Sequence, residues 1–176
     1  HEFNKTLSIP KSAITYKETE NIIKLEEKSA CEWIAQHSQF YLDGSEFHFE
    51  STEGSELLYT DLENYLQSYG LYEFEKETAE QYLLNPYSGE WIKGLKITLA
   101  EMGLIAYSGT YPRKKETSAR FATKEKQVAY IIARTAFVRS IFKLKGITEV
   151  PLFRGMSCEI DFFETPQTLA STTFSA

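Results

Sequence analysis

Apolar residues recur at helical spacing through most of the first 145 positions. Side chains three or four positions apart share one face of a helix, so this periodicity predicts amphipathic helices. The predicted helices are 18–37, 55–69, 76–84, a segment from Ser88 to Gly103, and 124–143. The last of these carries apolar residues around so much of its circumference that we expect it to be largely buried.

Residues with strong preferences for helix ends mark several boundaries. Gly70 and Gly103 stand where a C-terminal glycine would end a helix. Thr123 can cap the predicted helix 124–143, because its hydroxyl can accept a hydrogen bond from a free backbone N–H. In the segment 40–54 the helical period is lost and short alternations lie between two glycines. This pattern predicts a loop or a small hairpin.

The character of the chain changes after Gly146. The segment 147–156 is short, begins with a β-branched residue and contains Pro151, which favours an edge strand or the entry to a strand. Residues 169–175 form a second predicted strand. The predicted fold class is therefore α+β, with a mostly helical N-terminal lobe followed by the first strands of a β core.

The same patterns divide the chain into three parts. Residues 1–3 are typical of a cloning remnant and are set aside. Residues 4–145 are the expected helical lobe, and residues 146–176 the expected start of the β core. With 176 residues and 42% apolar content, the chain can bury one sizeable core. No apolar run reaches the roughly 18 residues that a membrane-spanning helix needs, and no secretory signal opens the chain.

The net charge of −6 hides a strong segregation of charge along the chain. Residues 1–110 hold 8 Lys and Arg against 19 Asp and Glu, whereas residues 111–154 hold 11 against 3. A basic stretch of this kind can dock on an acidic partner. It can equally be one of two solvated helical faces that attract each other within one domain. Nucleic acid is the weaker candidate partner, because the chain is acidic as a whole.

Cysteine and histidine usage limits the available chemistry. Cys31 falls in a helical pattern, where a buried thiol is the simplest interpretation. Cys158 has no histidine near it in sequence that could activate it as a nucleophile. Two cysteines do not make a disulfide framework, so we expect a reducing compartment. The three histidines have no metal-site spacing, and no metal is expected.

The residues with the clearest chemical pattern stand in the last quarter of the chain. The predicted strand 147–156 carries Arg154 and Gly155 near its end, and Ser171-Thr172-Thr173 lies in the second predicted strand. A guanidinium offers forked donors that suit a pyrophosphate, and a glycine lets the backbone pass close to a ligand. The arginine and the hydroxyl-bearing strand therefore suggest a pocket for a dinucleotide.

This pair of motifs resembles the mono-ADP-ribosyltransferase family, in the branch marked by an Arg, a Ser-Thr-x motif and a Glu-x-Glu. The resemblance covers about the last 50 residues and implies that the two strands begin the family's β core. It implies NAD as the substrate, with Arg154 and Gly155 at its pyrophosphate side. Ser171 would help to place the nicotinamide ribose and the catalytic glutamate, and Thr172 would support that strand. Phe174 would be an aromatic wall beside the nicotinamide or a core residue.

The third motif of that family is absent from the sequence. No Glu-x-Glu follows Ser171 before Ala176, so we expect an incomplete form of the enzyme that lacks its catalytic glutamate. Bond cleavage through an oxocarbenium-like state requires a carboxylate near the ribose. The acids between the two motifs come in the wrong order for this role and are expected in the connecting hairpin: Glu159, Asp161 and Glu164. Glu75 and Glu77 form a Glu-x-Glu far upstream, where we expect a solvated helical turn.

Two functions remain open at this stage. The first is NAD-dependent mono-ADP-ribosylation of a protein side chain, arginine among the candidates, by a toxin-like or virulence effector. Such an effector would be secreted or injected and act in a target-cell cytoplasm; otherwise we expect a cytoplasmic protein. The alternative is a helical protein-interaction module without catalysis, which docks through the basic stretch at Lys114, Lys115 and Arg120.

Overall fold

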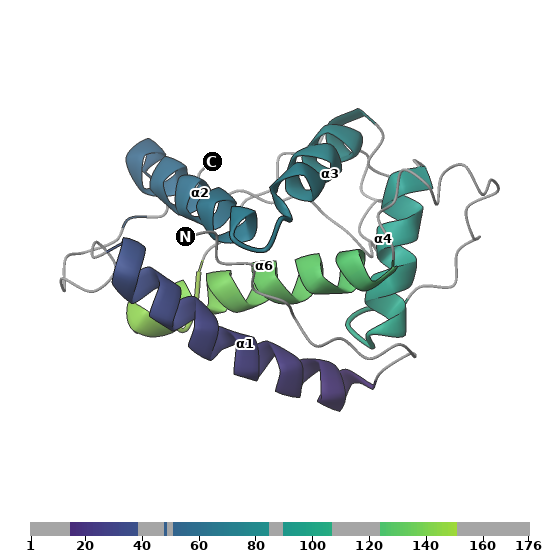
Figure 1. Ribbon diagram of the computed structural model, residues 1–176, viewed down its shortest axis with the longest axis horizontal. Helices are drawn as coiled ribbons and strands as arrows, with labels where there is room; N and C mark the ends of the chain where they lie inside the picture. The colour runs from purple at the N-terminus through teal and green to yellow at the C-terminus, as the bar shows by residue number, and fades with distance from the viewer. Residues whose placement is uncertain (1–14, 39–47, 49–50, 85–89, 107–123, 151–176) are drawn as a thin grey trace, which may run out of the picture.

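The computed structural model describes residues 15–38, 48, 51–84, 90–106 and 124–150. Figure 1 shows the arrangement of their helices around α6, which lies between α1 on one side and α2 and α3 on the other. The helices are α1 (Tyr16–His37), α2 (Thr52–Gln67), α3 (Tyr72–Leu84), α4 (Glu90–Glu101) and α6 (Lys124–Leu144).

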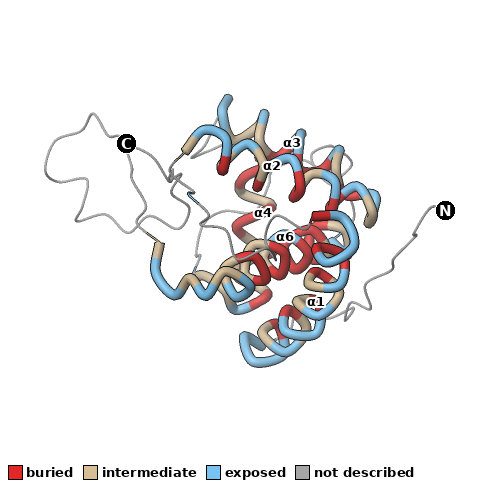
Figure 2. The backbone as a smooth tube through the Cα atoms, turned by 90° about the vertical axis from the view of Figure 1, so that its left-hand side faces the viewer, coloured by how far each residue is buried: buried red, intermediate tan, exposed pale blue. Residues whose placement is uncertain are grey.

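Helix α6 is the centre of this arrangement. It packs most extensively against α1 and also contacts α2 and α4, while α3 packs between α2 and α4. Figure 2 shows that buried residues follow α6 along most of its length, whereas the outer sides of α1, α2 and α3 are exposed. The expectation of a largely buried helix at 124–143 is confirmed. Its residues Ile132, Ala133, Ala136, Phe137 and Ile141 are almost fully inaccessible to solvent.

The predicted α+β fold class is wrong for the part of the chain that the structure describes. All regular elements there are helices, and residues 147–150, where the first strand was expected to begin, have no regular secondary structure. Ile147 instead donates its backbone N–H to the carbonyl of Phe142 at 2.8 Å. This hydrogen bond closes the C-terminal end of helix α6, so the N–H of Ile147 is not free to pair with a strand. The rest of the two predicted strands, 151–156 and 169–175, lies outside the described residues.

Three of the helices end in the same way, with a glycine in the left-handed backbone region. Gly70, Gly103 and Gly146 have φ values of 65°, 70° and 66°. The residue after each glycine donates its N–H five residues back, as Leu104 does to Leu99 at 2.9 Å. These following residues also pack on the apolar core, which is the arrangement of a Schellman motif. The glycine signals at 70 and 103 were therefore interpreted correctly.

The helix starts differ from the sequence-based expectations by up to four residues. Helix α1 begins at Tyr16 because Thr15 and Glu18 form a reciprocal capping box. Helix α2 begins at Thr52, where Ser51 accepts a hydrogen bond from the N–H of Gly54 at 3.0 Å. The predicted loop 40–54 is wrong at its last three residues for this reason. Helix α3 begins at Tyr72 rather than at residue 76.

Replacing Gly103 by alanine should destabilise the protein more than the same change at Gly146. Both glycines have a positive φ, which costs an alanine about 1 kcal/mol. A Cβ at Gly103 would also lie 2.8 Å from the backbone nitrogen of Tyr16, whereas nothing lies within 4 Å at Gly146. We expect a loss of about 2–3 kcal/mol for Gly103→Ala and about 1 kcal/mol for Gly146→Ala. Urea unfolding measures both, and equal losses would contradict the close approach.

Candidate functional site

The residues that sequence reasoning placed at an NAD pocket all lie outside the described residues. The residues concerned are Arg154, Gly155, Ser171, Thr172 and Phe174. Cys158 and the three acids between the motifs lie outside them as well. Their expected roles therefore stay predictions, and the geometry that can be described is that of the helical domain before them.

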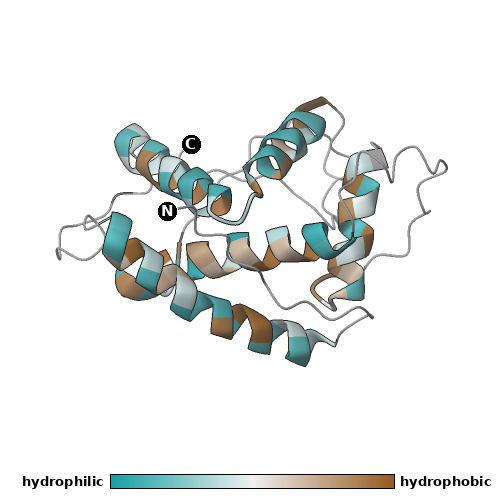
Figure 3. Cartoon of the chain, in the orientation of Figure 1, coloured by the Kyte–Doolittle hydropathy of each residue, from teal (hydrophilic) through white to brown (hydrophobic). Residues whose placement is uncertain are grey.

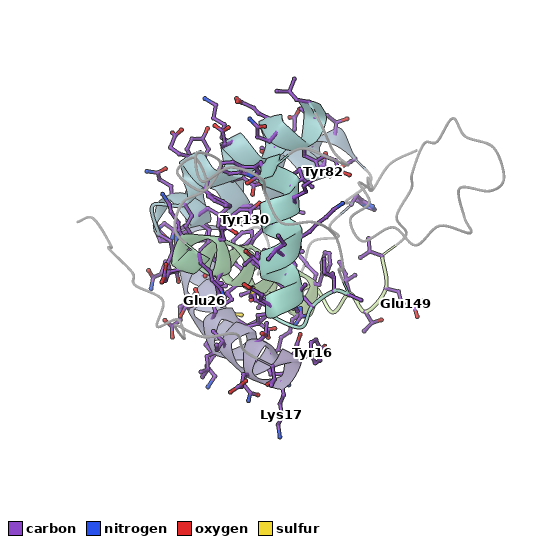
Figure 4. All side chains as sticks on the ribbon, turned by 90° about the vertical axis from the view of Figure 1, so that its right-hand side faces the viewer. Tyr16, Lys17, Glu26, Tyr82, Tyr130 and Glu149 are labelled. Carbon is purple, nitrogen blue, oxygen red and sulfur yellow. The ribbon has the colours of Figure 1, made fainter. Side chains whose placement is uncertain are left out.

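The chain that leads toward Arg154 is anchored where helix α6 ends. Gly146 turns the backbone, and the side chain of Ile147 packs against the apolar core. Residues 148 and 149 are exposed, and Glu149 lies at the edge of the bundle, on the segment that leaves it (Figure 4). The predicted site thus follows directly after a helix whose last turn is fixed by packing and hydrogen bonds.

A buried carboxylate joins α1 to α2. Glu26 lies among the apolar residues of α1 and is 6% exposed. Its Oε1 accepts a hydrogen bond from the hydroxyl of Tyr65 at 2.5 Å and another from the hydroxyl of Tyr69. The ring of Tyr65 stacks on Phe137 of α6, with 5.0 Å between the ring centroids, and Trp33 of α1 meets both rings edge-on. The carboxylate is therefore held inside an aromatic cluster at the α1–α2–α6 junction.

The tyrosines of this cluster are fixed as hydrogen-bond donors. Burial, and then the hydrogen bond to Glu26, raise the pKa of Tyr65 far above its ordinary value. The pKa of Tyr69 is raised for the same reasons. Both phenols therefore keep their protons at any physiological pH, and they are unsuited to proton transfer near neutrality. We interpret the cluster as a structural link between helices.

A second buried carboxylate links α3 to α6. Glu75, 4% exposed, accepts a hydrogen bond from the hydroxyl of Tyr130 and lies 3.3 Å from the Nε of Arg134. Burial is the main cause that raises the pKa of Tyr130, so this phenol also remains a donor. The expectation that Glu75 belongs to a solvated helical turn is wrong, because its side chain faces α6. Glu77, two positions on, is half-buried and accepts a hydrogen bond from Gln81 at 2.9 Å.

Three of the five basic residues of α6 pair with acidic residues of three other helices. Arg139 makes a bidentate pair with Glu20 of α1, both contacts at 2.9 Å. Lys124 lies 2.7 Å from Glu101 of α4, and Arg134 reaches Glu75 of α3. These contacts favour the second interpretation of the charge segregation, in which acidic and basic parts of one domain attract each other.

The pair of Glu20 and Arg139 should make stability depend on pH below about 4.5. The hydrogen bond from Arg139 lowers the pKa of Glu20 from the ordinary 4.5. A carboxyl whose pKa is lower in the folded state stabilises the protein above its unfolded pKa. This contribution is lost as the pH falls through the folded pKa. Because Arg139 is 41% exposed, solvent screening limits the contribution to about 1 kcal/mol.

Glu20→Gln should therefore cost up to about 1 kcal/mol at pH 7, and the difference from the wild type should shrink as the pH falls below 4.5 and through the lowered pKa of Glu20. Urea unfolding at several pH values measures it. Glu32→Gln, at an exposed position of the same helix, is the matched control and should cost little at any pH. A Glu20→Gln difference that stays constant over the whole acidic range would show that the ion pair is not its cause.

One buried polar atom among the described residues has no hydrogen-bond partner, the Oδ2 of Asp61 on α2. The described residues hold no group of three His, Cys, Asp or Glu side chains that could bind a metal ion. None of the described helices is long and apolar enough to cross a membrane.

Sequence reasoning missed both buried glutamates. Glu26 could have been found, because it stands three positions after Ile23 and four before Ala30, within the apolar face of α1. A charged residue at such a position must find partners inside the protein. Glu75 has no comparable signal, because the burial of its position depends on how α3 meets α6.

No family model, no curated protein and no solved structure that was compared matches this chain.

Proposed function

We propose that this chain belongs to an NAD-dependent mono-ADP-ribosyltransferase that modifies a protein side chain. The observation that carries the proposal is the combination of Arg154-Gly155 with Ser171-Thr172-Thr173. The guanidinium of Arg154 offers the planar, forked donors that hold a pyrophosphate at two oxygens. The Ser171 hydroxyl can hydrogen-bond the nicotinamide ribose, from which the nicotinamide leaves as an oxocarbenium-like centre forms.

The two buried glutamates of the helical domain are poor candidates for the catalytic carboxylate. The carboxylates buried in the core at Glu26 and Glu75 are committed to tyrosine donors and to an arginine. They hold helices together and are not presented to a ligand. Residues 151–176 carry the two motifs whose residue types fit a dinucleotide, and they begin seven positions after the end of α6 at Leu144.

The alternative of a basic docking module is less well supported. Of the six basic residues that the structure describes in the stretch 111–154, three form ion pairs within the domain: Lys124, Arg134 and Arg139. Lys114, Lys115 and Arg120, through which docking was expected, lie outside the described residues. A side chain that already holds an intramolecular carboxylate contributes less to an acidic partner. The proposed enzyme would act as a secreted or injected effector on a protein in a target-cell cytoplasm.

Titration calorimetry with NAD tests the proposal on the protein in the full form that its gene encodes. Arg154→Ala should weaken NAD binding at least tenfold, because a charge-assisted hydrogen bond contributes about 1.5–3 kcal/mol. Arg154→Lys keeps the charge but loses the forked geometry and should also bind less tightly. Arg113→Ala, outside the motif, is the matched control and should bind NAD as the wild type does.

Two results would contradict the enzyme assignment. One is a wild-type protein that shows no heat of binding at millimolar NAD. The other is a wild-type affinity that Arg154→Ala and Arg113→Ala leave equally unchanged. Thermal unfolding of each variant, measured in parallel, separates a lost contact from a lost fold.

A further inference from the structure

The exposed sides of α2 and α3 form a surface that combines apolar and acidic residues. Of the large hydrophobic side chains, Leu83 is 83% exposed and Leu84 is 79% exposed at the end of α3, and Tyr59 on α2 is 44% exposed. Figure 3 shows the hydrophobic end of α3 at the outside of the bundle, away from α1. Single exposed hydrophobic residues are common, but several on one continuous surface mark an interaction site.

The residues of α3 show how this surface continues along the helix. Tyr72, Lys76, Ala79 and Leu83 are spaced by four, three and four positions, so they share one stripe along α3. None of these four residues is buried. The stripe is roughly 16 Å long at 1.5 Å per residue, which matches three turns of a second helix. The apolar stem of Lys76 can cover a partner while its charge stays in water.

Tyr59 extends the stripe onto α2. Burial is the largest cause that raises the pKa of Tyr59, and its phenol lies close enough to Glu75, Glu63 and Tyr72 for each to raise that pKa further. Helices α2 and α3 pack against each other. Figure 2 shows the outer sides of both helices as exposed.

Acidic residues border this stripe on both helices. Glu73 and Glu80, seven positions apart, are exposed on one flank of α3. On α2, Glu56 and Glu63 stand three positions before and four positions after Tyr59. Segment 51–84 as a whole carries eight Asp and Glu against a single Lys. We call the surface of Tyr59, Tyr72, Leu83, Glu56, Glu73 and Glu80 the α2–α3 outer face.

The geometry points to the α2–α3 outer face as a docking site for a basic amphipathic helix of a partner protein. Side chains spaced by four and three positions along a helix form the kind of stripe against which the apolar side of a second helix can pack. The acidic border selects a partner whose seam is flanked by Lys or Arg. A second copy of this chain would bring its own acidic border against the first, and the repulsion disfavours that occupant. The inference is independent of the NAD chemistry proposed above.

A synthetic peptide tests this inference directly. The probe is a fluorescein-labelled helical peptide with leucine at heptad positions a and d and lysine elsewhere. Fluorescence anisotropy at about 0.1 M salt should show saturable binding that weakens as salt rises. A peptide with glutamate in place of lysine should not bind, and a scrambled peptide of the same composition should bind at least tenfold more weakly. If the scrambled peptide binds as tightly as the lysine peptide, the binding is general charge attraction and the proposal is wrong.

Matched variants assign the binding to this surface. Leu83→Ser should weaken binding of the lysine peptide at least tenfold, because the change removes apolar area that a docked helix would bury. Leu25→Ser is the control, since Leu25 is 63% exposed on α1. Glu73→Lys with Glu80→Lys should likewise reduce affinity, whereas Glu32→Lys on α1 should not. Equal effects of the Leu83 and Leu25 changes would sink the docking site, as would self-association in sedimentation that Leu83→Ser abolishes.

Discussion

Replacing Phe137 by alanine is expected to lower the free energy of unfolding by about 4 kcal/mol. Phe137 is fully buried at the middle of α6, where its ring stacks on Tyr65 and meets Trp33 edge-on at 5.9 Å between centroids. Removing it opens a cavity at the point where α1, α2 and α6 meet. Rigid neighbours on three helices cannot collapse into that space without moving a whole helix.

Urea unfolding followed by tryptophan fluorescence measures this loss, because Trp33 lies in the same cluster. Phe137→Leu is the control that keeps most of the volume, and it should cost less than half as much. Leu25→Ala, at an exposed position of α1, should change stability by less than about 0.5 kcal/mol. A loss below about 2 kcal/mol for Phe137→Ala would mean that the junction repacks, contrary to a close-packed core.

Glu26→Ala is expected to cost about 3 kcal/mol. The change removes the acceptor of two tyrosine hydroxyls, and hydrogen bonds to a charged group contribute about 1.5–3 kcal/mol each. Tyr65 is fully buried and has no access to water, so its hydroxyl would be left without its strong partner. The hydroxyls of Tyr65 and Tyr69 lie 3.4 Å apart, and the hydrogen bond between them can recover only part of the loss.

A double-mutant cycle separates the hydrogen bond from the change in volume. Tyr65→Phe alone should cost about 1–2 kcal/mol, because it leaves the Glu26 carboxylate with one donor fewer. In the Glu26→Ala background the same change should cost almost nothing, since the acceptor is already gone. Glu26→Gln, which keeps an acceptor oxygen, should recover part of the stability. Additive losses for Glu26→Ala and Tyr65→Phe would exclude the buried pair as the source of the effect.

Much of the helical domain could be predicted from local sequence patterns. Apolar spacing located the five helices that the described residues contain, and the ends at Gly70 and Gly103 followed from the preference of glycine for a positive φ. The starts of α2 and α3 were placed too late. Ser51 caps its helix through a hydrogen bond to Gly54, a local signal that was masked by the surrounding aromatic and glycine residues.

The prediction of a strand after Gly146 was wrong at residues 147–150. A β-branched residue after a glycine fits a strand entry, but it also fits the apolar position of a Schellman motif. Ile147 takes the second role, because its side chain packs against the core and its backbone N–H donates to the carbonyl of Phe142. The choice between the two roles depends on whether the apolar core lies within reach of the residue. The local sequence does not contain that information.

The functional residues likewise fall into those that the local sequence could identify and those that depended on tertiary packing. The sequence alone determined the helical periodicity, the helix-ending glycines, the segregation of acidic from basic residues and the Arg154 and Ser171 motifs that suggest NAD. Only the tertiary structure decided that Arg139, Arg134 and Lys124 form ion pairs with acidic residues of α1, α3 and α4, respectively. Only it decided that Glu26 and Glu75 are buried links between helices. Periodicity and capping act between neighbours in the chain, whereas the burial and pairing of a charge depend on which distant helix packs against it.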